Sequence, residues 1–312
     1  LNKNTTGQYN VAIGYLAMNC NTGGTNNVGV GYGALSLNTC GIENTAVGAS
    51  TLYFNTCGCR NTAIGIGSLY NNTCGQQNIA IGYYAMCLNT FGGNNVAIGL
   101  QALRANTSGS NNIGIGVNAL FSNQTSTGLI GIGQSALAGD TSGAGNTAIG
   151  YEALSCTDVG SSNTAIGYQA AKLGTYVGNV VAIGYQALAQ NIGGVNVAVG
   201  AMALCSNTTG YNNNAMGHQA LFRNTSGCTN TAIGTGALYT NTLGCENTAI
   251  GTSALYFNIR GNNNTAIGAG AMQNNRCGNT NIAIGCGVLY NNTSGCTNIA
   301  IGQGVLYANT LG

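Results

Sequence analysis

Apolar and polar residues recur along this chain with a fixed period of seventeen residues, which is the spacing from Gly14 to Gly31 and from Gly31 to Gly48. The period of seventeen is marked by a glycine that follows a small residue and then an aliphatic residue, and it recurs 18 times with one shorter step, from Gly184 to Gly200. The sequence Asn-Thr-Ala-Ile-Gly alternates and is rich in β-branched residues, which predicts a short strand. The apolar Ala-Leu segment after the glycine predicts a second strand. The Asn-Thr-x-Gly segment that follows predicts a turn in which glycine provides a positive φ.

These elements predict one coil per repeat, with each residue stacked on its equivalent one repeat away. The expected fold is all-β, a parallel β-solenoid or β-roll of 18 coils over residues 1–312, and it would form a rod on the order of 85 Å long. Asn stands four residues before the glycine in 16 repeats and seven residues after it in 15 repeats. We expect stacked Asn side chains to bond to one another along the axis. Two rows of constant size are expected to be buried: Leu35, Leu52, Leu69 and Leu103, and Ile64, Ile81 and Ile98.

Two residues before the repeat glycine only Ala or Gly occurs. This restriction implies that another backbone approaches closely, either the opposite wall of the same thin coil or a partner chain. A coil of this short length holds few large side chains, so we expect the chain to share an apolar seam in a homo-oligomer, most simply a trimer. Charged residues make up only 4% of the chain, which leaves a lone coil poorly protected against association.

Composition narrows the partners further. The net charge is +2 without a basic cluster, which argues against nucleic-acid binding. No apolar run approaches the ~18 residues of a membrane helix, so membrane insertion is not expected. Both ends of the sequence are repeats without a polar cap. They are typical of a segment of a longer fibre, or of a unit that stacks end to end on others.

The motif Asn-Thr-Ala-Ile-Gly-Tyr-x-Ala-Leu stands at 146–154 and recurs in related form at 163–170 and 230–238. It resembles the repeat arrays of phage tail-fibre proteins and the repeats in the heads of trimeric autotransporter adhesins. The resemblance covers essentially the whole chain. It implies a left-handed, trimeric β-roll, although the adhesin repeat is shorter than the repeat of this chain.

Thirteen cysteines gather at particular positions of the repeat. Stacking places Cys228 beneath Cys245, and Cys277 one coil from Cys296, within the Cα separation that a disulfide tolerates. Disulfides would indicate an oxidising, extracellular setting, whereas free thiols would act as small packing residues. The candidate disulfide cysteines share the positions nine and eleven residues after the glycine: Cys40, Cys57, Cys74 and Cys277, and Cys59, Cys228, Cys245 and Cys296.

Tyrosines also form rows, and the longest contains Tyr151, Tyr168 and Tyr185. An exposed aromatic row can bind a surface glycan or a receptor, and it can equally be a stabilising ladder or a seam between chains. Rows of Thr and Asn raise the alternative of an ice-binding face, although the neighbouring turn residues are irregular.

Catalytic and metal chemistry find little support. Asp140, Glu152 and Asp158 fall in a stretch where the Asn rows are interrupted, which indicates either a cation site or drift in a tolerant array. The single histidine, His218, has no second ligand cluster beside it, so we expect no metal and no cofactor. No nucleophile stands with a base and an orienting group, so we expect no enzyme activity.

The sequence therefore predicts the shaft or head of an extracellular attachment fibre on a virion or cell surface. Its expected partners are further copies of the chain, with end-to-end contacts as one form of that assembly, and a surface glycan or receptor. The rival interpretation is a self-assembling structural filament without receptor binding, and ice binding is a minor alternative.

Overall fold

The computed structural model describes residues 2–156, 160–174 and 178–312. The chain is an all-β parallel β-solenoid of about 17 turns with one strand in each repeat, and the described residues contain no helix. It divides into two compact units, Leu1–Gly160 and Ser161–Gly312.

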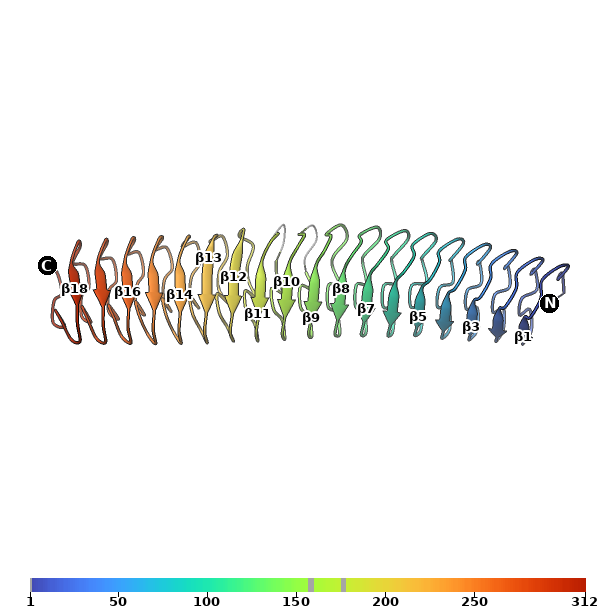
Figure 1. Cartoon of the computed structure of the whole chain (residues 1–312), viewed down its shortest axis with the longest axis horizontal. Helices are drawn as coiled ribbons and strands as arrows, with labels where there is room; N and C mark the ends of the chain where they lie inside the picture. Colours follow the sequence, from blue (N-terminus) through green and yellow to red (C-terminus); the bar gives the residue numbers. More distant parts are fainter. Residues whose placement is uncertain (1, 157–159, 175–177) are drawn as a thin grey trace. The chain divides into compact units, whose positions relative to one another are not determined.

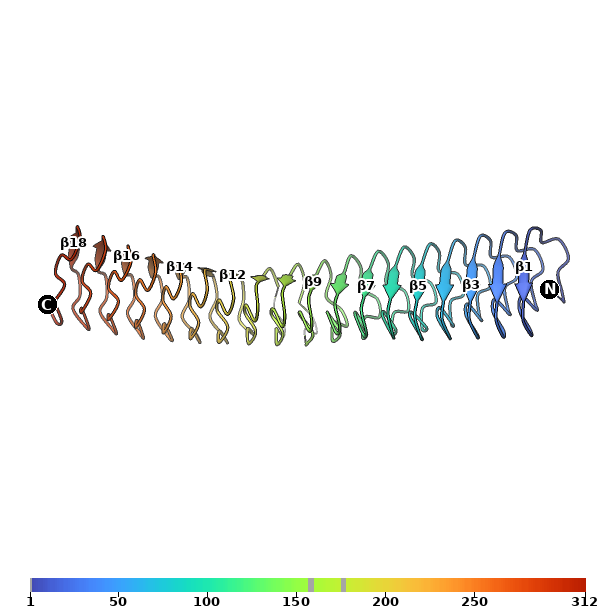
Figure 2. The ribbon, with the colours of Figure 1, turned by 90° about the horizontal axis from the view of Figure 1, so that it is seen from below.

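The first unit is a parallel sheet of very short strands. Each strand pairs with the next at an offset of one repeat, so that Val28 lies opposite Thr45 and Ala46 opposite Ala63. The strands lie side by side along one side of the coils, and the turns form the other side (Figures 1 and 2). The strands are β1 (Val11–Ile13), β2 (Val28–Val30), β3 (Thr45–Val47), β4 (Thr62–Ile64), β5 (Ile79–Ile81), β6 (Val96–Ile98), β7 (Ile113–Ile115), β8 (Ile130–Ile132) and β9 (Thr147–Ile149).

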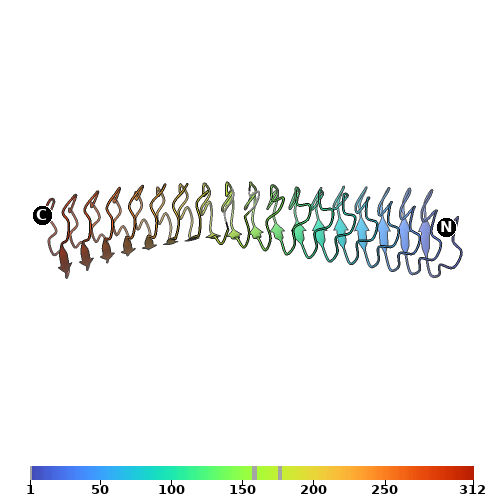
Figure 3. The same ribbon diagram turned by 90° about the horizontal axis from the view of Figure 1, so that it is seen from above.

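The second unit repeats this arrangement (Figure 3). The register changes at the short repeat, where Val181 lies opposite Val197, one residue less than a full period. Its strands are β10 (Thr164–Ile166), β11 (Val181–Ile183), β12 (Asn196–Val199), β13 (Asn213–Met216), β14 (Thr231–Ile233), β15 (Thr248–Ile250), β16 (Thr265–Ile267), β17 (Ile282–Ile284) and β18 (Ile299–Ile301).

The prediction of a second strand around Ala-Leu is wrong, because this segment forms a run of turns. Leu35, Leu52 and Leu69 each adopt a φ near +50°, which lies in the left-handed region and is incompatible with a strand. Their backbone N–H groups still bond to the next coil, as Leu35 does to the Thr51 carbonyl at 3.0 Å. The segment therefore keeps the stacking expected of a strand without its conformation.

Alanine and leucine fill the interior of each coil. Leu35, Leu52, Leu69 and Leu103 are fully buried, as the sequence predicted. A Cβ added to Gly114 would lie 3.2 Å from the Leu103 side chain, so the position two before the repeat glycine packs on the leucine of the preceding coil. The restriction to Ala or Gly thus reflects the opposite wall of a single thin coil, and Ala148 and Ala165 are buried within the single chain.

The prediction that the Ile row is buried is wrong for the single chain. Ile64 and Ile98 are 39% and 36% exposed, and Ile81 is half-buried. Side chains alternate between the two faces of a strand, so Thr62 and Ile64 of β4 share one face and Ala63, which is the buried residue, lies on the other. The Leu row leaves room there for the small Ala63, and the Ile on the same strand points outward.

The repeat glycine is required by the stacking of one coil on the next. Gly31 adopts a φ of +133°, and a Cβ there would lie 2.5 Å from the carbonyl oxygen of Gly48. Because both the conformation and the approach exclude a side chain, glycine recurs at this position in every repeat.

The missing residue of the short repeat is absorbed in one turn. Asn191 and Asn196 are separated by five residues, and their side chains still bond, Nδ2 of Asn196 to Oδ1 of Asn191 at 3.2 Å. Asn207 donates to Asn191 at 2.6 Å across 16 residues. The turn between the two Asn positions therefore accepts a change of length without breaking the polar interior.

Candidate functional site

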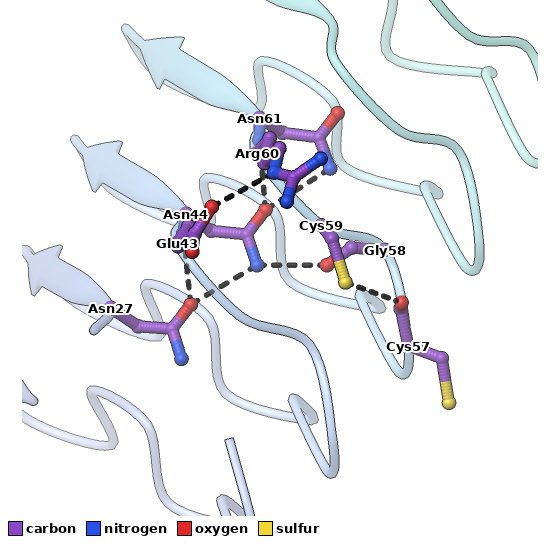
Figure 4. A network of polar contacts seen from close by, with 8 residues as sticks. All are labelled: Asn27, Glu43, Asn44, Cys57, Gly58, Cys59, Arg60 and Asn61. Carbon is purple, nitrogen blue, oxygen red and sulfur yellow. Dashed lines mark hydrogen bonds and ion pairs between the residues drawn. The ribbon is translucent and has the colours of Figure 1, made fainter. Parts of the chain in front are cut away.

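Two buried ladders of asparagine hold the coils together. In the first ladder, formed by the Asn four residues before the repeat glycine, Asn44 donates its backbone N–H and its side-chain amide to Oδ1 of Asn27, at 3.0 and 3.1 Å. The same amide donates to the Gly58 carbonyl at 2.8 Å, and Asn61 repeats the pattern on Asn44 (Figure 4). Each amide thus satisfies a neighbour along the axis and a turn of the next coil, as the sequence predicted.

The second ladder lies seven residues after the repeat glycine. Asn38 donates to Oδ1 of Asn21 at 2.7 Å and to the carbonyl of Gly41, three residues ahead, at 3.1 Å. Buried amides that lack partners are costly, so two such ladders specify the stacking register as well as stabilising it.

Substitutions interrupt both ladders: Leu129 and Val180 in the first, and Asp140, Thr157 and Gly174 in the second, of which Thr157 lies outside the described residues. Leu129 and Val180 replace Asn in the first ladder, and their backbone N–H groups still donate to Oδ1 of Asn112 and Asn163. Asp140 replaces Asn in the second ladder and is fully buried. Its two carboxylate oxygens accept from Gly143 N at 2.7 Å and Asn146 Nδ2 at 2.9 Å.

The acidic stretch is therefore not assembled into a cation site in the described residues. Asp140 is part of the polar interior, and Glu152 lies half-buried on the repeat that follows. Asp158 lies outside the described residues. Among the residues that the structure describes, no group of three His, Cys, Asp or Glu side chains is placed to hold a metal ion. His218 lies exposed on its repeat.

One row of turn cysteines contains a disulfide. Cys40 and Cys57 are bonded, with their Cα atoms 5.0 Å apart. Cys74 stands at the same position one coil further and is an exposed free thiol. The backbone N–H groups of Cys40, Cys57 and Cys74 all bond to a threonine carbonyl of the next coil, at 3.0 to 3.1 Å. The three residues therefore occupy equivalent positions in successive turns.

The other candidate cysteines are free thiols. Cys228 and Cys245 stack as predicted, with their sulfur atoms 2.6 Å apart, and burial raises the pKa of the Cys245 thiol. Cys277 and Cys296 are offset by two residues, and the sulfur of Cys296 instead accepts from the N–H of Asn279 at 3.3 Å.

The thiol of Cys59 is also free, and its partner is an oxygen atom rather than a second sulfur. It donates to the carbonyl oxygen of Cys57 at 3.3 Å, within its own turn (Figure 4). The disulfide that the structure contains thus belongs to the row nine residues after the repeat glycine.

The tyrosine rows are stacked; Tyr168 and Tyr185 are exposed, whereas Tyr239 and Tyr256 are half-buried. The rings of Tyr168 and Tyr185 lie 5.4 Å apart at 12°, and those of Tyr239 and Tyr256 lie 4.7 Å apart at 1°. Tyr151 is exposed on the first unit. Stacked rings stabilise the coils, and their outer edges remain open to a ligand.

A hollow of about 450 Å³ opens on the first unit, and the repeat pattern gave no sign of it. We call it the aromatic hollow. A second hollow of about 290 Å³ shares Asn71 and Leu88 with it. The aromatic hollow is lined by Tyr70, Asn71, Tyr83, Tyr84, Cys87, Leu88, Gln101 and Arg104.

Arg104 gives this hollow its charge. Its Nε is buried and has no hydrogen-bond partner among the described residues. Its guanidinium carbon lies 5.5 Å from the centre of the Phe121 ring, an arrangement that holds the side chain in place. Burial raises the pKa of Cys87, which donates to the Arg104 carbonyl at 3.9 Å.

The strand face of each unit carries an apolar stripe. We define the strand stripe as the residues immediately before the repeat glycines, Ile13 to Ile149 in the first unit and Ile166 to Ile301 in the second. Ile64, Ile149 and Ile250 are each between 36% and 39% exposed. A continuous apolar surface of this kind marks an interaction site on most proteins.

Comparison with known protein families finds none that matches this chain, and no curated protein is similar to it in sequence. The resemblance to fibre and adhesin repeats therefore depends on the repeat motif alone. None of the described residues forms a helix that is long and apolar enough to cross a membrane.

Proposed function

We propose that this chain is a segment of an extracellular attachment fibre, in which three copies associate through their strand stripes and carry aromatic surfaces toward a receptor. The observation that supports this proposal best is the strand stripe. Each coil directs an Ile, Val or Met outward although its own interior is already filled by Ala and Leu.

The stripe is poorly suited to water. An Ile, Val or Met stands in the stripe in each repeat, and none of the few charged residues of the chain stands there. Burying the stripe against the same stripe of other copies removes this surface from water. Closed cyclic symmetry does so without open-ended lateral growth, which favours a trimer or a similar ring. By the resemblance described above, we take the coil of each copy to be left-handed.

The remaining faces provide contacts for a receptor. The stacked tyrosines and the aromatic hollow stand one to six residues after the repeat glycine, outside the strand stripe. The Cys40–Cys57 disulfide fits an oxidising, extracellular location. No nucleic-acid partner, cofactor or catalytic role forms part of this proposal.

The molar mass in solution tests this proposal. We expect the chain to sediment as a trimer, and Ile250→Lys to yield monomers, because Ile250 is exposed in the single chain and its lysine would be buried only in the assembly. Phe257→Lys is the matched control, since Phe257 is 41% exposed and Arg223 already stands at the same repeat position. A stable, soluble monomer of the parent chain at micromolar concentration would contradict the proposal.

The rival function is a structural filament. An open-ended polymer in the same sedimentation experiment, with no binding to cells or glycans, would favour this rival over the attachment fibre.

Ice binding is a second alternative, and one observation favours it. Thr45 and Thr62 stand in register on the strand face beside the strand stripe, which forms a repeated surface of hydroxyl and methyl groups. Thermal hysteresis of the monomeric Ile250→Lys variant and of the parent chain would reveal this activity. Its absence in both would remove this alternative.

A further inference from the structure

The aromatic hollow combines three chemical features in one place. Tyr83 and Tyr84 form a corner, with ring centres 4.5 Å apart and planes at 90°. Tyr70 closes another side and is itself held by Tyr53 and Phe54, whose rings lie 5.4 and 5.2 Å from its own. The aromatic walls are therefore fixed by their neighbours before any ligand arrives.

The backbone makes room for this corner. A Cβ on Gly67 would lie 2.6 Å from the Tyr84 ring, so the ring lies directly over that glycine in the preceding coil. The Tyr84 ring can adopt this position because residue 67 is a glycine, so the sequence of these coils forms the hollow.

Arg104 and two amides add polar groups to the aromatic walls. The side chains of Asn71 and Gln101 line the same hollow and offer both donors and acceptors. The chain has seven Lys and Arg residues in 312, and Arg60 is paired with Glu43 at 2.9 Å. An arginine whose buried Nε lacks a partner is therefore uncommon in this molecule, and its guanidinium favours a planar anion such as a carboxylate.

We propose that the aromatic hollow binds an acidic sugar, a pyranose that carries a carboxylate, as part of a glycan chain. The apolar face of the ring stacks on Tyr83 or Tyr84, the carboxylate pairs with Arg104, and the hydroxyl groups bond to Asn71 and Gln101. Small-ligand sites have volumes of about 300–1,000 Å³, a range that includes this hollow. The adjoining hollow beyond Asn71 and Leu88 extends the site for a neighbouring sugar.

This inference deepens the proposed function, because it names the receptor chemistry that an attachment fibre of this sequence would recognise. It does not depend on the assembly, since every lining residue belongs to one copy and lies outside the strand stripe.

Calorimetric titration of the full chain tests the site with three probes: an oligogalacturonate, a sulfated neutral oligosaccharide and a neutral cello-oligosaccharide. We expect the oligogalacturonate to bind best. We expect Arg104→Gln to weaken its binding by about tenfold or more, and Tyr84→Ser to weaken binding similarly. Both replacements already occur at the same repeat positions, as Gln273 and Ser50, so these variants should fold.

Arg223→Gln is the matched control, because Arg223 lies 5.7 Å over the Tyr239 ring but outside the aromatic hollow. Equal binding of the sulfated and the uronate probes would overturn the preference for a carboxylate. Equal loss in the Arg104 and Arg223 variants, or no binding by a trimeric parent chain, would overturn the site while leaving the fibre proposal standing. Uronate binding by a parent chain that is monomeric would uphold the site and remove the trimeric fibre.

Discussion

At the scale of the residue, the stacking depends on the side-chain amide of asparagine. Each ladder amide is a donor and an acceptor at once, so it can bond to an identical group in the next coil and to a glycine carbonyl. A carboxylate has nearly the same shape and no N–H. A carboxylate can therefore only accept hydrogen bonds, and Asp140 accepts from Gly143 N and Asn146 Nδ2.

We therefore expect Asp140→Asn to stabilise the first unit by about 1 kcal/mol, because it restores a donor to the ladder and removes a buried charge. The reciprocal change, Asn106→Asp, should destabilise the unit by about 2 kcal/mol, since Asn106 donates both to Asn89 and to Gly109. Thermal unfolding of both variants measures these effects. Equal melting of the two variants would contradict the role of the amide.

The repeat glycine leads to a second prediction at this scale. Gly31→Ala should destabilise the unit by about 3 kcal/mol or more, because the new Cβ meets the Gly48 carbonyl and the φ of +133° is closed to alanine. Gly23→Ala is the control, since a Cβ there makes only an ordinary 3.4 Å contact with Thr6. Hydrogen exchange of the neighbouring coils would show the difference, and similar protection in both variants would count against the stacking argument.

At the scale of the element, the turn brings equivalent side chains of successive coils together. Cys57 stands between Cys40 and Cys74 in one row of turns, and the structure pairs it with Cys40. The backbone contacts of the three turns are alike, so the turn itself does not select the partner.

We expect Cys40→Ser to move the disulfide to Cys57 and Cys74 when glutathione disulfide is supplied as oxidant. The control, Cys74→Ser, should keep the bond between Cys40 and Cys57. Peptide mapping without reductant distinguishes them. Complete alkylation of Cys57 in the Cys40→Ser variant would show that the two inter-coil steps are not equivalent.

The stacked thiols of Cys228 and Cys245 provide a pH-dependent prediction. Burial raises the pKa of Cys245, so less of the reactive thiolate is present at neutral pH than in an exposed cysteine. With glutathione disulfide supplied as oxidant, we expect the pair to become oxidised: one thiolate attacks the glutathione disulfide and releases one glutathione, and the second cysteine then displaces the other glutathione. The rate should rise as the pH is raised above neutrality, because the thiolate is the attacking species. Full alkylation of both thiols after oxidation at high pH would show that stacking alone does not lead to a bond.

At the scale of the whole molecule, the sequence predicts what depends on periodicity. The coil, the Leu row and both Asn ladders were readable because each residue contacts its own equivalent one repeat away. The orientation of the strand was not, since an alternating Thr-Ala-Ile segment has two possible inner faces. The volume of the side chains decides which face is buried, because only Ala63 and its equivalents fit beside the leucines.

The aromatic hollow escaped prediction for the opposite reason. Tyr70 and Arg104 share one repeat position with Cys87 between them, and Tyr84 stands at another position, so no row of like residues marks the hollow. The signal that could have found them is a local departure from the repeat: an arginine among tyrosines in a chain with very few charges.

The turn between Asn191 and Asn196 carries a consequence for how the gene can change. Removing one whole period, such as 248–264, brings Asn247 to the place of Asn264, so the ladders can close again over the gap. Removing a single residue from β15 would instead turn its side chains to the wrong face. Recombination between repeats can thus lengthen or shorten the protein in whole periods, while small insertions and deletions survive only in the turn where this chain already has one.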